Sequence, residues 1–166
     1  SMNGPLIAQS HWVDEGALTA GSHLQENQIA RLQAALAYLA RQGVAMEEVI
    51  AISPFRAVAD RLESLSGTYP GLRAGTIHTA QGREASVVFL VLGGDPNSPG
   101  AKAWAASSVN LVNVAASRAK RRLFVIGDRT SWAEHNYFHQ LATSLALSQA
   151  ASAEGPKPPR VPEPLD

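Results

Sequence analysis

The chain alternates short, continuously apolar runs with helical patterns, and this alternation constrains its fold more than any other feature. The clearest apolar run, residues 87–92, lacks the polar–apolar alternation of a half-exposed strand. The longest helical pattern begins near residues 24–27 and ends at Gly43, a residue type favoured at helix C-termini. Apolar strands separated by helices predict a parallel sheet with helices on both faces, which is an α/β fold.

The remaining elements continue this alternation along the chain. The predicted strands cover residues 5–13, 49–52, 75–77, 87–92 and 123–126. Further helices are predicted from residue 53, over 111–119 and over 132–147. We expect one domain over residues 5–147, after a tag or linker at 1–4 and before a disordered, proline-rich tail at 148–166. Residues 101–108 look like an insertion.

Composition limits the classes of function. The 166 residues are 45% hydrophobic, which is enough for the core of one domain. Fourteen basic residues balance 14 acidic ones, so any contact with nucleic acid must come from a local patch. The absence of cysteine excludes disulfides and thiolate metal sites, and with only five histidines no metal site is expected. The apolar runs are too short to cross a bilayer, which favours a cytoplasmic protein that has no membrane partner.

Polar side chains gather around the ends of the predicted strands. Ligands of open parallel sheets bind beyond the carboxyl ends of the strands. Phe55 and Arg56 follow one strand, residues 78–84 follow the next, and Arg118 ends the helix before the last strand. Two arginines, a carboxylate and an aromatic ring suit a nucleoside triphosphate. No segment reads GxxxxGK[ST], so the chain carries half of a nucleotide site at most.

Three segments, SPFRA, HTAQGRE and NVAASRAK, occur in the order and spacing of a known motor domain. They resemble motifs IV, V and VI of superfamily one helicases, and the resemblance covers roughly residues 6–145. The similarity is to the clade that includes the nonsense-mediated-decay RNA helicase and related bacterial DNA helicases. It implies a RecA-like, C-terminal motor lobe of the P-loop NTPase superfamily that lacks its own phosphate-binding loop.

The resemblance also implies roles for individual residues. Arg56 and Arg118 would be catalytic, each contacting the terminal phosphate, while Phe55 would lie against the adenine and Glu84 would bind the ribose. Cofactor-binding residues would be Phe55, Gln81, Gly82 and Glu84. Contacts to the nucleic-acid backbone would come from Thr76, His78 and Thr79.

The implied partners complete the site. ATP with Mg²⁺ would bind in a cleft shared with an N-terminal RecA-like lobe of the same parent chain, and single-stranded DNA or RNA would be the track. The isolated lobe is then predicted not to hydrolyse ATP. Two other hypotheses remain open: a non-catalytic RecA-like module that docks a protein, and a small-ligand α/β domain, which would need a glycine fingerprint that Gly16 and Gly21 do not provide.

Several of these residues also have structural interpretations. Arg118 and the basic residues after it could complement the dipole at a helix C-terminus. Phe55 could belong to the core. The tryptophans are interpreted as packing residues: Trp12, Trp104 and Trp132.

Overall fold

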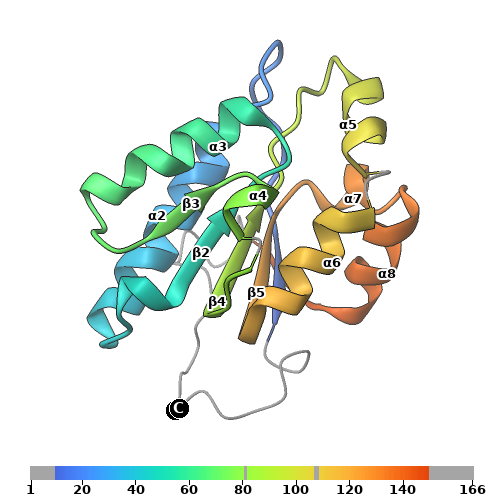
Figure 1. The fold of residues 1–166 in the computed structure, drawn as a ribbon. Helices are drawn as coiled ribbons and strands as arrows, with labels where there is room; N and C mark the ends of the chain where they lie inside the picture. The colour runs from blue at the N-terminus through green and yellow to red at the C-terminus, as the bar shows by residue number, and fades with distance from the viewer. Residues whose placement is uncertain (1–9, 81, 107–108, 150–166) are drawn as a thin grey trace.

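A parallel β-sheet forms the centre of the molecule in the computed structural model, which describes residues 10–80, 82–106 and 109–149 (Figure 1). Within these residues six strands pair in the order β3-β2-β4-β5-β1-β6, and every pairing is parallel. The strands are β1 (His11–Asp14), β2 (Val49–Ile52), β3 (Arg73–Gly75), β4 (Ala85–Val91), β5 (Ala119–Gly127) and β6 (Ala146–Gln149). The predicted α/β class is confirmed.

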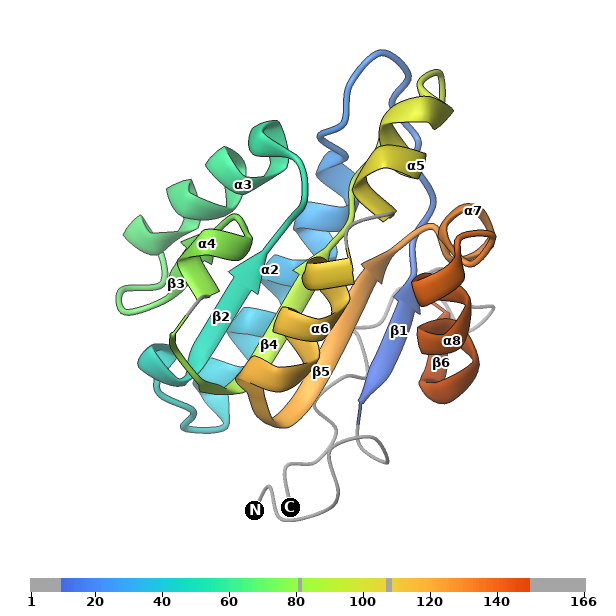
Figure 2. The same ribbon diagram turned by 45° about the vertical axis from the view of Figure 1, so that its right-hand side comes forward.

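Helices cover the two faces of this sheet. They are α2 (Glu26–Arg41), α3 (Arg56–Glu63), α4 (Ile77–Ala80), α5 (Pro99–Ala106), α6 (Val109–Arg118), α7 (Arg129–Trp132) and α8 (Asn136–Ser144), with single 3₁₀ turns η1 (Met46–Glu48) and η2 (Ser64–Gly67). From β1 to β3, each strand lies nearer the β3 edge of the sheet than the strand before it, and from β4 to β6 each strand lies farther from that edge. Because crossovers between parallel strands are right-handed, this reversal puts α2 behind the sheet and α4 and α6 in front of it (Figures 1 and 2).

The core lies on both sides of the central strand β4. Its residues from Val87 to Val91 have no exposed surface, as expected for a strand that is covered on both faces. The predicted stripe of α2 packs against this core through Ile29, Leu32, Leu36 and Leu39. Trp12 and Trp132 are also fully buried, which confirms that they are packing residues. Trp104 is different: 69% of its surface is exposed on α5, so the packing prediction was wrong there.

Two predicted elements need correction. The strand expected at 75–77 ends at Gly75, and the next residues form the short helix α4. The helix expected over 132–147 breaks into α7 and α8, and the chain then pairs with β1 as β6. Local sequence cannot reveal this pairing, because the partner strand lies more than 100 residues away in the chain.

The corrected boundaries change two segments. Residues 148 and 149 belong to β6 rather than to the predicted tail, while residues 1–9 and 150–166 lie outside the described residues. The segment interpreted as an insertion folds mainly as α5. In the described part of the chain, no helix is both long and apolar enough for a membrane crossing.

Candidate nucleotide and nucleic-acid site

The predicted site residues divide between the two edges of the sheet. Arg56 follows the carboxyl end of β2, and Thr76 follows that of β3. Glu84 and Arg118 directly precede β4 and β5 and therefore lie at the amino ends of the strands. The seven residues of β4 separate the two groups by roughly 20 Å along the strand direction. This differs from the single crevice that the sequence suggested.

Glu84 and Arg118 are neighbours at the amino edge. Ala85 of β4 pairs with Ala119 of β5, so the residue before each of them leaves the sheet at the same level. The Glu84 side chain is exposed, whereas Arg118 is half-buried at the end of α6. Its Nε is buried and has no hydrogen-bond partner among the described residues. A buried donor in this state can take an acceptor from outside the chain, such as a water molecule or an anion.

A tight turn positions Glu84. Gly82 has a φ of +74°, a conformation that glycine adopts without strain, and the Arg83 N–H donates to the Ala80 carbonyl at 3.1 Å. The Arg73 guanidinium then donates to two main-chain carbonyls, those of Glu84 at 3.2 Å and Glu47 at 2.9 Å. These bonds tie the turn to the start of β3. Gln81, which was predicted to bind the cofactor, lies outside the described residues.

Phe55 belongs to the core instead of presenting a free face. Only 6% of its surface is exposed, the His23 ring stacks on it at 4.0 Å between centroids, and Trp132 meets it edge-on at 6.3 Å. An adenine could not stack on Phe55 without displacing His23. The loop before α2 covers the ring in this structure, and the base contact stays a prediction.

Arg56 is exposed at the first turn of α3, at the carboxyl edge of the sheet. Its Nη1 lies 3.6 Å from Asp60 Oδ1 and 4.0 Å from Glu63 Oε2. Exposed ion pairs of this kind contribute little stability, so the guanidinium remains available to a ligand. That ligand would approach the carboxyl edge and not the Glu84–Arg118 pair.

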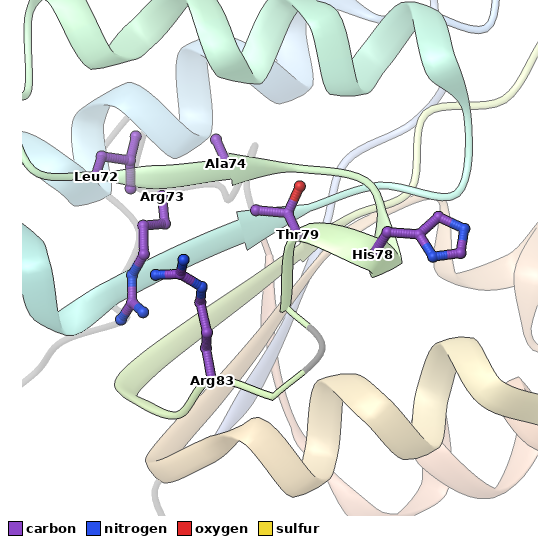
Figure 3. A pocket seen from close by; sticks show the side chains of 6 residues that line it. All are labelled: Leu72, Arg73, Ala74, His78, Thr79 and Arg83. Atoms are coloured by element: carbon purple, nitrogen blue, oxygen red, sulfur yellow. The ribbon is translucent and has the colours of Figure 1, made fainter.

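The predicted backbone-binding residues lie on and around α4. The Thr79 N–H donates to the Thr76 carbonyl at 2.9 Å, which closes the helical turn. A Cβ at position 75 would collide with the Thr79 hydroxyl and reach 3.0 Å from Glu63 Oε2, so this approach requires Gly75. His78 and Thr79 line a hollow of about 550 Å³ together with Leu72, Arg73, Ala74 and Arg83 (Figure 3).

Sequence reasoning missed the polar side chains that hold the loops around the site. Gln28 is fully buried; it accepts from the Gly93 N–H at 2.8 Å and donates to the Glu15 carbonyl at 3.0 Å. Lys102 is 7% exposed and donates to Ser131 Oγ at 2.6 Å. A glutamine within the apolar face of α2 was the available signal for the first contact. Nothing in the local pattern indicates the second.

Two carboxylates have pKa values below their ordinary range. At the amino edge, the hydrogen bond from the Ser86 hydroxyl lowers the pKa of Glu48, and the charges of Lys120 and Arg73 add to the effect. At the carboxyl edge, N–H groups of Asn97 and Gly21 bond to Asp95 and lower its pKa. Among the described residues, no group of three or more His, Asp or Glu side chains could hold a metal ion.

A comparison with protein-family models identifies the family of this chain. A family model described as an AAA domain matches residues 8–130, which include all three polar segments. The chain belongs to the AAA domain family. This AAA domain is a helicase-like, RecA-like lobe, and its parallel sheet with flanking helices agrees with the RecA-like fold. No curated protein matches the chain significantly.

Proposed function

We propose that this AAA domain is the second motor lobe of an ATP-dependent helicase or translocase. The observation that carries the proposal is that Glu84 and Arg118 directly precede the paired residues Ala85 and Ala119, and that the buried Arg118 Nε has no acceptor among the described residues. Family membership supports the motor assignment. The resemblance to the clade of the nonsense-mediated-decay helicase and its bacterial relatives gives the same function.

In this proposal ATP with Mg²⁺ binds between the amino edge and an N-terminal RecA-like lobe that supplies the phosphate-binding loop. The orphaned Arg118 donor fits a phosphate oxygen, and the exposed Glu84 carboxylate fits ribose hydroxyls. Gly82, in the turn before Glu84, would border the nucleotide, and Gln81 remains assigned to the cofactor. Arg118 would stabilise the charge that develops during phosphoryl transfer, a contribution of about 10³-fold or more in related enzymes.

The carboxyl edge is the proposed track for single-stranded DNA or RNA. We assign Thr76, His78 and Thr79 to backbone contacts there, and we move Arg56 from the phosphate to this group. The position of Glu63 supports this grouping. Its Oε2 lies 4.0 Å from Arg56 Nη1 and also lies close to Gly75, the residue that the Thr79 hydroxyl approaches. Backbone contacts carry no sequence information, so binding is sequence-tolerant and salt-sensitive. Opening and closing of the ATP cleft would then move the lobes along the strand.

Strand displacement tests this function. The full-length parent protein is mixed with a partly double-stranded oligonucleotide with and without ATP, as wild type and as Arg118→Ala. We expect ATP-dependent displacement by the wild type and its loss in the variant, while Arg41→Ala, an exposed arginine on the far helix α2, leaves it intact. If ATP has no effect on the wild type, a protein-docking module is the better account.

A further inference from the structure

The hollow beside α4 is lined by two arginines, Arg73 and Arg83, to which the proposed function gives no role. Its walls come from the edge strand β3, from α4 and from the turn before β4. Figure 3 shows the guanidinium groups of Arg73 and Arg83 near each other below Thr79, with the His78 ring turned away from both. Leu72 and Ala74 add short apolar surface, and the described residues that line the hollow include no carboxylate.

The two arginines differ in what they already bind. The Arg73 guanidinium donates to the carbonyls of Glu47 and Glu84 and interacts with the Glu48 charge. Arg83 is exposed, and among the described residues its guanidinium makes neither a hydrogen bond nor an ion pair. Two cations that face one concave space without a lining carboxylate create a positive potential there. Such a space favours an anion with several acceptor oxygens.

A volume of about 550 Å³ is larger than one phosphate needs and lies within the range of about 300–1,000 Å³ that small-molecule sites occupy. Among the described residues that line the hollow, the one aromatic ring is that of His78, and it points away from the two arginines instead of lying over them as a stacking platform. A ligand would therefore be recognised through phosphate and not through its base.

We propose that this hollow binds a phosphodiester of the single strand, with Arg83 as the principal cation and Arg73 and Thr79 as additional donors. The strand as the source of the phosphate rests on the proposed function; the affinity for phosphate does not. The site extends the track from α4 toward the amino edge, because Arg83 precedes Glu84 directly. It places a strand contact next to the nucleotide-facing carboxylate, where binding of strand and nucleotide can influence each other.

The test uses the 166-residue chain without nucleotide. The Nε–H resonances of its arginines are followed by two-dimensional NMR during titration with an oligothymidylate and, separately, with pyrophosphate. We expect the Arg83 signal to shift with the oligothymidylate, and Arg83→Gln to weaken binding about tenfold and to reduce the slope of affinity against salt by about 0.7. Arg41→Gln, an exposed arginine on α2, should bind like wild type.

Arg83→Gln is the decisive variant because it leaves no internal hydrogen bond broken among the described residues, whereas Arg73→Gln also removes two. Equal oligothymidylate affinity in wild type and Arg83→Gln, or a wild type whose Arg83 signal does not move, would overturn the proposal. Binding of pyrophosphate at least as tight as that of the oligothymidylate, lost in Arg83→Gln, would keep the phosphate site but make a free nucleotide its source. None of these results depends on ATP hydrolysis, so failure of the motor proposal is detected separately.

Discussion

In the proposed function, the Glu84 carboxylate binds the ribose of the nucleotide. We predict that Glu84→Gln in the parent protein raises the KM for ATP about tenfold with a small effect on kcat, since a hydrogen bond to a charged group is worth about 1.5–3 kcal/mol. Steady-state kinetics with ATP and with 2′,3′-dideoxy-ATP measures this. The wild type should prefer ATP, and the variant should lose that preference. An unchanged preference would show that Glu84 does not contact the ribose.

Gly75 controls the packing of α4 on β3. An alanine there would bring its Cβ into the Thr79 hydroxyl at a φ of +154°, so we predict that Gly75→Ala lowers the free energy of unfolding by about 1–3 kcal/mol. Gly67→Ala is the matched control, because no atom lies within 4 Å of a Cβ at that position. Urea denaturation of both variants provides the comparison. Equal stabilities would mean that the contact with Thr79 relaxes without cost.

At the scale of single residues, the sequence motifs predicted which residues belong to the candidate site but not how these residues are arranged. Glu84 and Arg118 were both predicted as site residues from their segments, but their neighbouring positions in the sheet depend on the pairing of Ala85 with Ala119. That register is a tertiary property. Phe55 shows the opposite limit, because its identity suits a base contact while its burial under His23 depends on a loop more than 30 residues away.

At the scale of elements, buried glutamines hold the loop before α2 against the end of β4. Gln28→Ala would leave the Gly93 N–H and the Glu15 carbonyl without their partner in a buried site. We predict a loss of about 1–3 kcal/mol in the free energy of unfolding. Gln33→Ala on the same helix, a partly buried side chain, should cost less than about 0.5 kcal/mol. Thermal and urea unfolding, monitored by circular dichroism, measures both stabilities. Equal free energies of unfolding for the two variants would contradict the prediction.

Elements with strong periodicity could be predicted, while elements fixed by distant contacts could not. The apolar stripe of α2 and the apolar run of β4 could be predicted from sequence, because burial on one or both faces of an element leaves a periodic or continuous apolar pattern. The helical turn α4 and the strand β6 have no such pattern. The first depends on the approach of Thr79 to Gly75, and the second on the free edge of β1.

For the whole molecule, the lowered pKa of Asp95 predicts a direction of pH dependence. A carboxylate whose folded pKa lies below its unfolded value stabilises the fold above the unfolded pKa, and this contribution is lost as pH falls through the folded pKa. The melting temperature should therefore fall on acidification below about pH 4. Asp95→Asn should be less stable than wild type at neutral pH, and the difference should shrink in acid. A constant difference across this range would exclude the charge of Asp95 as its cause.

The features of the whole molecule agree with the proposal that it is one lobe of a motor. It has a RecA-like sheet, balanced net charge with local arginine clusters, and helicase motifs without a GxxxxGK[ST] segment. In the proposed function the two edges of the sheet have different roles: the amino edge carries Glu84 and Arg118, assigned to the nucleotide, and the carboxyl edge carries the residues assigned to the strand. This division is the central claim, and it requires Arg118 and Arg56 to have different roles.

The most direct test is strand-stimulated ATP hydrolysis by the parent protein at saturating ATP and saturating oligonucleotide, with Arg118→Ala compared with Arg56→Ala. The account predicts a fall in kcat of about 10³-fold for Arg118→Ala. For Arg56→Ala it predicts weaker strand affinity with kcat nearly unchanged. Circular dichroism must show that both variants are folded. A kcat for Arg118→Ala equal to that of the wild type, or an equally large loss in both variants, would contradict the account.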